Sequence, residues 1–407
     1  MWQNNQMNQF PVSDRVAQMH TSSTLKAGQR AAELREAGHK VVDLTVGEPD
    51  FDTPEFIKKY AIEGLQRGLT KYTAASGMKM FTESVSEYYS AQFGSEFSPS
   101  EVVASCGGKQ GLFNAACTLL NPGDDLLIPK PYWVTFPEIA TFCGANRVFV
   151  DTSETDFVLT AGQVRASMTE NTKAIIINSP NNPTGRVIPK AEMIRIIETC
   201  AERNVYVITD ECYLYFAYPP GEVFTSATLP KELRRYVCVG GSFSKTYAMT
   251  GWRLGFTIAN EEWSRAMVKL QSHSATHPTS FVQYAGGCAL KNREETIGSV
   301  NEMLAEYKRR RDWLIPALNG INGFKCEMPE GAFYAFVDVR GLLGADFEKS
   351  EDVANFVLDR CHTVVTDGAG FGAEGFIRIS YATSMENLKR AVDSFADLFG
   401  KADAKAA

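Results

Sequence analysis

The chain has 407 residues, and at roughly 150 residues per domain this length predicts two or three domains. Hydrophobic residues make up 44% of the sequence and charged residues 22%, and 41 Lys and Arg against 48 Asp and Glu leave a net charge of −7. This acidic balance argues against a broad nucleic-acid-binding surface, and the apolar runs are too short to cross a membrane.

Targeting and metal-binding signals are weak. The start, MWQNNQMNQF, has neither the cationic nor the apolar region of a secretory signal. The nine cysteines are dispersed without a C-x-x-C spacing, and of the five histidines only His273 and His277 have the H-x-x-x-H spacing. We therefore expect a cytoplasmic protein with reduced cysteines and no bound metal.

Between residues 100 and 260, short apolar segments alternate with helical patterns. Continuous apolar strands are typical of a parallel sheet covered on both faces, and helices between them favour a doubly wound α/β domain. We predict strands at Glu101–Ser105, Asp125–Ile128, Arg147–Val150, Lys173–Asn178, Val205–Thr209 and Tyr236–Val239, and a helix at Lys109–Leu120.

The last third of the chain indicates a second, smaller α+β domain. Its predicted elements are a helix at Val300–Leu318, strands at Ala332–Val337 and Phe376–Ser380, and a final helix with a capping box of Thr383 and Glu386 and with Gly400 beyond its end. We expect residues 51–299 to form a large domain, residues 13–50 and 300–400 the small domain, and residues 1–12 and 401–407 the tails.

Polar groups follow each predicted strand of the large domain. Ligands of an open parallel sheet bind beyond the carboxyl ends of its strands, so these segments should meet at one edge. They are Cys106 to Lys109, Ser179 to Gly185, Asp210 to Tyr213, and Gly240 to Lys245 followed by Thr250 to Arg253. Together they offer a phosphate cradle, an acid, an amide, a phenol and a lysine, which is the set that pyridoxal 5′-phosphate requires.

Eight motifs in the same order resemble the fold-type I aminotransferases. The chain is most similar to their bacterial aspartate aminotransferase branch, from about residue 13 to residue 400. The motifs are VGEPDFDTP (46–54), KYTAASG (71–77), GGKQGLF (107–113), KPYWV (130–134), NSPNNPTG (178–185), TDECY (209–213), SFSKTYAMTGWRLG (242–255) and RISYATS (378–384).

The resemblance implies a large domain that binds pyridoxal 5′-phosphate on a doubly wound, mostly parallel sheet. It implies that Lys245 is joined covalently to the cofactor and then moves a proton at the substrate, which requires a lowered amine pKa. It assigns Asp210 to the pyridine nitrogen, Asn182 and Tyr213 to the phenolic oxygen, and Trp133 to the ring face. The phosphate ligands implied are Gly108, Lys109, Ser242 and Arg253, together with Tyr72 acting on the neighbouring subunit of a homodimer.

The resemblance also implies a substrate site. Arg378 would bind the α-carboxylate, Gly47 would let the backbone approach the substrate, and Trp133 and Asn182 would contact it. Lys109 and Thr24 fit the places that bind an acidic side chain. The branch often has Lys-Pro where this chain has His20 and Thr21, a difference that argues against prephenate as a substrate.

Each of these residues alone has a structural explanation. Asp210 could cap a turn, Asn182 could be a plain turn residue, and Arg378 a surface arginine. Glu211 is expected to point elsewhere in a structural role. Gly368 to Gly372 resembles a dinucleotide-binding loop, but residue 373 is Ala, so the G-x-G-x-x-G pattern fails and we interpret the segment as a loop.

The leading hypothesis is an aspartate:2-oxoglutarate aminotransferase that acts on small molecules, without nucleic acid or membrane as a partner. The alternatives are an aromatic, kynurenine or prephenate aminotransferase, a C–S β-lyase that needs no oxo-acid acceptor, and a cofactor-binding regulator without turnover. Regulators of this fold carry a DNA-binding domain ahead of the motif series, and the segment before Gly47 is too short for one.

Overall fold

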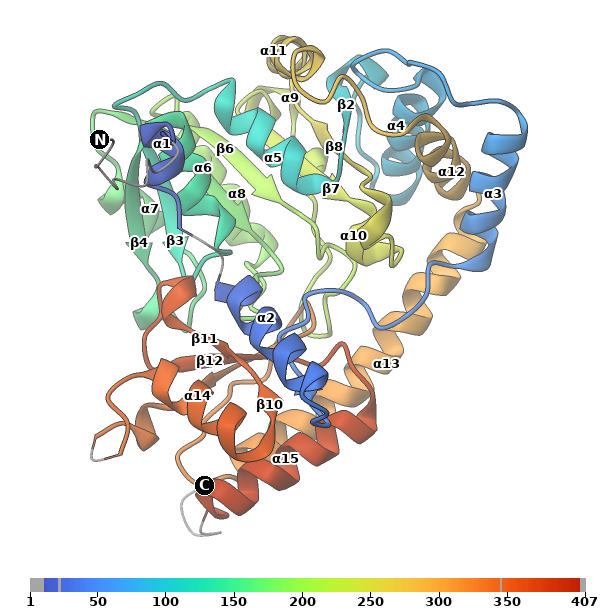
Figure 1. Cartoon of the computed structure of the whole chain (residues 1–407). Coiled ribbons are helices and arrows are strands. Elements are labelled where there is room, and N and C mark those ends of the chain that lie inside the picture. Colours follow the sequence, from blue (N-terminus) through green and yellow to red (C-terminus); the bar gives the residue numbers. More distant parts are fainter. Residues whose placement is uncertain (1–10, 21–22, 345, 403–407) are drawn as a thin grey trace, which may run out of the picture.

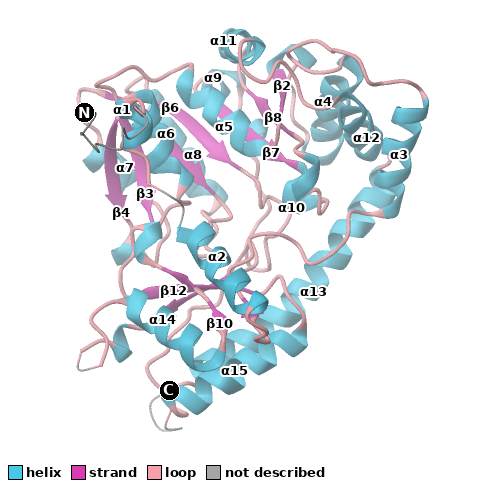
Figure 2. Cartoon of the chain, in the orientation of Figure 1, coloured by secondary structure: helices cyan, strands magenta, loops and turns pink. Residues whose placement is uncertain are grey.

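The computed structural model describes residues 11–20, 23–344 and 346–402. A large mixed sheet lies between helices in one part of the molecule, and two small sheets lie in the other (Figures 1 and 2). The strands of the large sheet are β2 (Val102–Ser105), β3 (Asp125–Lys130), β4 (Asn146–Asp151), β5 (Thr172–Asn178), β6 (Tyr206–Asp210), β7 (Val237–Ser242) and β8 (Gly255–Ile258).

The seven strands of the large sheet have the order β2-β8-β7-β6-β5-β3-β4. Only β8 runs against its neighbours β2 and β7, and the remaining pairs are parallel. The carboxyl ends of β2, β5, β6 and β7 therefore lie at the same edge. The predicted doubly wound, mostly parallel α/β fold is confirmed.

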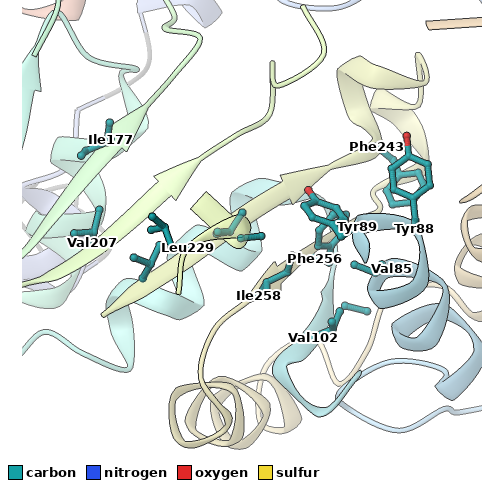
Figure 3. Close-up of a cluster of buried hydrophobic side chains, with 14 of the residues drawn as sticks. Val85, Tyr88, Tyr89, Val102, Ile177, Val207, Leu229, Phe243, Phe256 and Ile258 are labelled. Atoms are coloured by element: carbon teal, nitrogen blue, oxygen red, sulfur yellow. The ribbon is translucent and has the colours of Figure 1, made fainter. Parts of the chain in front are cut away.

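Helices cover both faces of this sheet. Alternate residues of each strand enter opposite hydrophobic clusters, as the two-residue period of a strand requires. One cluster joins Ile175, Ile177 and Val207 to α4 (Lys79–Phe93), α8 (Lys190–Ala201) and α12 (Ser280–Lys291), and Figure 3 shows part of it. The other joins Ile176, Ile208 and Cys238 to α5 (Gly108–Cys117), α6 (Thr135–Cys143) and α11 (Glu261–Ser272). The remaining helices of this part are α3 (Glu55–Gln66), α7 (Ala161–Ser167), α9 (Lys231–Arg234) and α10 (Phe243–Thr246).

The predicted strands match the observed ones closely, with three differences. Strand β8 was not predicted, and its four residues follow the short helix α10 and a 3-10 turn at Thr250–Trp252. Strand β4 lies at the sheet edge, and Phe149 is 41% exposed there, so β4 is not buried on both faces. Helix α5 ends at Cys117 rather than Leu120, and the Thr118 hydroxyl donates to the carbonyl of Asn114 in its last turn.

The second part combines segments from both ends of the chain. Strand β1 (Val42–Asp43) pairs in parallel with β10 (Thr363–Val364), and β11 (Thr366–Asp367), β12 (Phe376–Ser380) and β9 (Tyr334–Asp338) form an antiparallel sheet. This confirms a smaller α+β unit built from both chain ends. Its helices are α2 (Ser23–Glu36), α13 (Arg293–Asn319), α14 (Ser350–Cys361) and α15 (Met385–Phe399), whereas α1 (Asp14–Ala17) packs against α6 of the large part (Figure 1).

The predicted capping box of the last helix is wrong. Helix α15 begins one residue later than expected, and the hydroxyl of Ser384 accepts from the backbone N–H of Asn387 at 3.2 Å. The third helical residue is therefore Asn387 and not Glu386, so Thr383 and Glu386 do not form the reciprocal pair. Gly400 follows the end of the helix as expected.

Helix α13 runs alongside both parts of the molecule (Figure 1). Val300 belongs to a hydrophobic cluster of the large sheet, whereas Met303 and Tyr307 pack in the cluster of the small one. The domain boundaries at residues 50 and 299 stay a prediction. The predicted tails fall largely on residues 1–10 and 403–407, which lie outside the described residues. No helix in the described part of the chain is long and apolar enough to span a bilayer.

Candidate active site

A cavity of about 720 Å³ opens at the carboxyl edge of the large sheet, between this sheet and the small one. Its volume suits a cofactor with a small substrate. Of the residues singled out from the sequence, the cavity wall contains Gly47, Gly108, Lys109, Trp133, Asn182, Asp210, Tyr213, Ser242, Lys245, Arg253 and Arg378. The fold therefore brings together residues that lie more than 300 positions apart.

Asp210 is the last residue of β6 and supplies a buried carboxyl group to the cavity. Its backbone carbonyl accepts from the Asn178 side chain at 2.9 Å, and one carboxylate oxygen accepts from the N–H of Cys212 at 3.1 Å. Burial raises the pKa of Asp210 to about 6, although the Cys212 N–H and the amine of Lys245 oppose this shift. A cationic partner at this carboxyl would lower its pKa and make it a permanent anion.

Lys245 lies in the short helix α10, directly after β7, and its amine enters the cavity. Burial lowers the pKa of this amine, and the positive charges of Arg253 and Arg378 lower it further, against the opposing effects of Cys212 and Glu48. The site therefore shifts the amine toward its neutral form, which is the form that acts as a nucleophile or accepts a proton.

A cradle of small groups lies at the N-terminus of α5. Gly107 has a φ of 81°, and a Cβ atom there would lie 2.4 Å from Nη2 of Arg253. A Cβ atom on Gly108 would lie 3.0 Å from the Cβ of Ser242. Free backbone N–H groups, a hydroxyl and a guanidinium thus converge at a helix N-terminus, an arrangement that binds a phosphate group.

Arg378, on β12, is buried with only 2% of its surface exposed. Nη1 donates to Oδ1 of Asn182 at 2.9 Å, and Nη2 donates to the carbonyl of Thr45 at 2.8 Å. Its guanidinium carbon lies 4.4 Å from the ring centre of Tyr334 and 4.9 Å from that of Phe371. Within the described structure Nε has no hydrogen-bond partner, so the group retains a donor for an anion.

Hydrogen bonds to neighbouring side chains fix the positions of Asn182 and Tyr213. The backbone N–H of Asn182 donates to Oδ1 of Asn178 at 2.7 Å, which ties the loop to the end of β5. The hydroxyl of Tyr213 forms a 2.9 Å hydrogen bond with the hydroxyl of Tyr334. Burial raises the pKa of Tyr213 well above its usual value, so this phenol remains protonated.

Lys109 and Trp133 form one wall of the cavity. The amine of Lys109 lies 4.7 Å from the centre of the Trp133 ring, a cation–π contact. Partial burial, followed by the charges of Arg253 and Lys245, lowers the pKa of the Lys109 amine. A cation held beside an aromatic face is well placed to meet a distal carboxylate.

Two predicted site residues are not placed in this cavity. Tyr72 is 89% exposed and packs edge-on against the ring of His277 at 5.7 Å, outside the cavity of its own chain. Thr24 belongs to α2, and its side chain lies outside the described residues. His20 donates its backbone N–H to Glu138 at 3.1 Å.

Sequence reasoning missed other residues of the cavity wall. The most important is Tyr334, a buried strand residue that no motif distinguished from ordinary core aromatics. Cys212 is another, although it lies inside the quoted TDECY motif, and burial raises the pKa of its thiol to about 12. The others are Gly28, Gln29, Ala32, Leu112, Val134, Thr135, Asn178 and Ser244.

Glu211 and the glycine-rich segment lie where the sequence interpretation placed them. Glu211 is not among the residues of the cavity wall, and its Oε1 accepts from the N–H of Ser226 at 2.9 Å. Residues Ala369–Phe371 form a single 3-10 turn between β11 and β12. This loop supplies the Phe371 ring that packs on the guanidinium of Arg378.

Comparison with known proteins gives one consistent result. The sequence profile of the family described as aminotransferase class I and II matches residues 39–395. The aspartate/prephenate aminotransferase of Thermus thermophilus is 38% identical over 392 residues, which are 96% of this chain and 99% of that protein. The aspartate aminotransferase of Bacillus sp. (strain YM-2) is 36% identical over 384 residues, 94% and 97% of the two chains. The solved structure of the T. thermophilus aspartate aminotransferase with maleate has a TM-score of 0.91 at 36% identity and covers 96% of this chain and 100% of that one.

The pKa of Asp210 generates a prediction about stability without cofactor. The pKa of Asp210 is about 6 in the folded chain, against about 3.8 for the same group in the unfolded chain. Protonation of Asp210 therefore stabilises the fold fully below pH 4, and this contribution is lost as the pH rises through 6. Asp210→Asn removes the titration. We expect the variant to gain stability relative to the cofactor-free wild type between pH 4 and pH 7, by about 3 kcal/mol at most.

Urea unfolding of cofactor-free protein at a series of pH values measures this difference. Asp393→Asn, at an exposed carboxyl on α15, is the control and should show no such trend. A stability difference between Asp210→Asn and wild type that does not change with pH would contradict the prediction.

Proposed function

The chain belongs to the class I and II aminotransferase family, and on this basis we propose that it transfers the amino group of L-aspartate to 2-oxoglutarate. The family and the cofactor class that it implies agree with the resemblance inferred from the eight motifs. One observation supports the proposal above all. One cavity contains a lysine with a lowered pKa (Lys245), a buried carboxyl group (Asp210) and a buried arginine (Arg378).

The family implies pyridoxal 5′-phosphate, and the residues present fit this cofactor. Gly107 and Gly108 have no Cβ atom, and the space that such an atom would fill is open to a phosphate group. The guanidinium of Arg253 and the hydroxyl of Ser242 adjoin that space. With the backbone N–H of Lys109, they supply the donors that the phosphate requires. The buried Asp210 supplies the acid that a pyridine nitrogen requires.

When bound, pyridoxal 5′-phosphate takes up the amino group and withdraws the electron pair left at the substrate Cα. Lys245 would hold the cofactor through its side-chain nitrogen and, once released, carry the proton to and from Cα as a neutral amine. Asp210, ionised by a protonated ring nitrogen, would hold the positive charge that draws electrons from Cα.

Three further residues would orient the cofactor ring. Asn182 and Tyr213 would donate hydrogen bonds to its phenolic oxygen, and both lie in the cavity wall. Trp133 would stack on one face of the ring.

Arg378 would bind the α-carboxylate of every substrate. Its free Nε, together with an Nη group, offers the two parallel donors that a carboxylate prefers. Gly47 would border the same carboxylate, since it lines the cavity without a side chain.

The preference for an acidic substrate rests on charge. Lys109, Lys245, Arg253 and Arg378 line a cavity in which, among the described residues of the wall, Asp210 is the one carboxylate. Phosphate and α-carboxylate engage Arg253 and Arg378, which leaves Lys109 for a second carboxylate, with Thr24 proposed beside it. Prephenate also carries two carboxylates, and it is the alternative substrate to test.

We also propose a homodimer with shared active sites. The ring of Tyr72 and two apolar side chains of α3, Ile62 and Leu65, are respectively 89%, 53% and 47% exposed. A second copy of the chain would cover these groups. Tyr72 would then reach the phosphate in the partner's cavity.

Lys245→Ala tests the central proposal. We expect borohydride reduction of the wild type to fix a pyridoxyl group on Lys245, detectable as a modified peptide by mass spectrometry. The variant should carry no such group and lose at least about a thousandfold in kcat, because a general base contributes 10²- to 10⁴-fold. Lys269→Ala, at an outer position of α11, is the control. A wild type with no trapped adduct would sink the proposal.

Lys109→Ala tests the assignment of the acidic side chain. We expect kcat/KM for aspartate and glutamate to fall about 10- to 100-fold, since a charged hydrogen bond contributes about 1.5–3 kcal/mol. The values for alanine and phenylalanine should barely change. Arg378→Ala is the matched variant and should lower kcat/KM for all four amino acids. Equal losses for acidic and neutral substrates in Lys109→Ala would refute its role in specificity.

Mixed dimers test the role of Tyr72. Tyr72→Ala and Lys245→Ala should each be nearly inactive, and each should elute at twice the 44.9 kDa of one chain. After joint refolding, each hybrid dimer has one intact site, so about a quarter of the wild-type activity should return if the copies pair at random. If Tyr72 acts only within its own chain, mixing will restore nothing.

A further inference from the structure

Tyr334 contacts three residues of the proposed site at once. It lies at the start of β9 and is only 1% exposed. Its hydroxyl lies 2.9 Å from the hydroxyl of Tyr213, and its ring faces the guanidinium of Arg378 at 4.4 Å. A Cβ atom on residue 47 would lie 3.2 Å from the same hydroxyl, so the glycine avoids a close contact with it.

The chemistry of the site decides which of the two phenols donates the hydrogen bond between them. A phenol has one O–H to donate, and the proposed function requires that Tyr213 donate its own into the cavity. Tyr213 must then accept from Tyr334. Burial raises the pKa of both phenols, so both keep the proton that this chain of two donors needs. A donor that itself accepts a hydrogen bond becomes a stronger donor.

The ring of Tyr334 has a separate contact. Together with Phe371 it encloses the guanidinium of Arg378 between two aromatic rings, at 4.4 and 4.9 Å. Such contacts stabilise a desolvated cation, and they fix the plane of the group. The plane matters because two parallel N–H donors must meet one carboxylate.

We propose that Tyr334 is a positioning residue whose hydroxyl directs the proton of Tyr213 into the cavity and whose ring fixes Arg378 for the substrate carboxylate. This inference rests on the proposed function. The hydroxyl and the ring of this side chain have separate functions, which act on different ligands. The hydroxyl acts on cofactor binding, and the ring acts on substrate binding.

Two substitutions separate these functions. Tyr334→Phe keeps the ring and removes the hydroxyl, so we expect the Kd of pyridoxal 5′-phosphate for the cofactor-free protein to rise about three- to tenfold, for one hydrogen bond of about 1 kcal/mol. The KM for aspartate should change less than about twofold. Tyr334→Leu also removes the ring and should raise this KM about tenfold.

A double-mutant cycle tests the shared hydrogen bond. Tyr213→Phe should weaken cofactor binding at least as much as Tyr334→Phe, and the double variant should bind no more weakly than Tyr213→Phe alone, because the second hydroxyl acts only through the first. Phe395→Leu, which removes a buried ring from the same hydrophobic cluster, is the control for lost packing and should leave both Kd and KM unchanged.

Each outcome has a distinct meaning. An unchanged Kd in Tyr334→Phe, or additive losses in the double variant, would overturn the function of the hydroxyl. An equal rise of KM in Tyr334→Phe and Tyr334→Leu would overturn the function of the ring. Wild-type protein that binds no pyridoxal 5′-phosphate would instead refute the proposed function, and the inference about Tyr334 with it.

Discussion

The site depends on positive charge that is concentrated in a partly buried cavity. Lys109, Lys245, Arg253 and Arg378 line the same space, and Asp210 is the carboxylate that faces them. Two like charges 4 Å apart at an effective dielectric constant of about 20 repel by about 4 kcal/mol. Such a cavity lowers the pKa of its amines and favours anions. A phosphate and the carboxylates of a substrate relieve the repulsion, which is why this charge pattern supports a phosphorylated cofactor and a dicarboxylic amino acid.

The sheet topology explains how distant residues come to share this cavity. Asn178, Asp210 and Gly240 are aligned across β5, β6 and β7, so their following loops must meet at one edge. Arg378, the arginine proposed to bind the substrate, comes from the other sheet. Arg378 donates both to the carbonyl of Thr45, near the N-terminus, and to Asn182 of the large part. One guanidinium therefore connects three chain segments at the cavity.

The sequence predicted the elements with strong local signals and missed those set by tertiary contacts. Continuous apolar strands such as β5 and β6 were located to within a residue, because both faces are covered by helices. Strand β8 was missed because four residues between loops carry little periodicity, and the cap of α15 was misplaced because Thr383 and Ser384 are chemically equivalent candidates.

The same limit applies to the site. Motifs located the residues that follow strands, since their position depends only on where a strand ends. Tyr334 has no such signal. It alternates with Phe333 and Ala335 in a buried strand, and only the pairing of β9 with β12 places its ring on Arg378. Tyr72 is exposed in the single chain, and its proposed function depends on a second copy that one sequence does not display.

Arg378, proposed to bind the substrate, and the two proposed donors to the cofactor's phenolic oxygen are connected in this structure. Arginine has only donors, so its bond to Asn182 fixes the amide oxygen toward Arg378 and turns the NH₂ group away from it. That NH₂ is then the group that can donate to the phenolic oxygen. Tyr213, the second donor, is joined to Arg378 through Tyr334, whose hydroxyl meets one residue and whose ring meets the other. A carboxylate that displaces or rotates the guanidinium must therefore act on both donors.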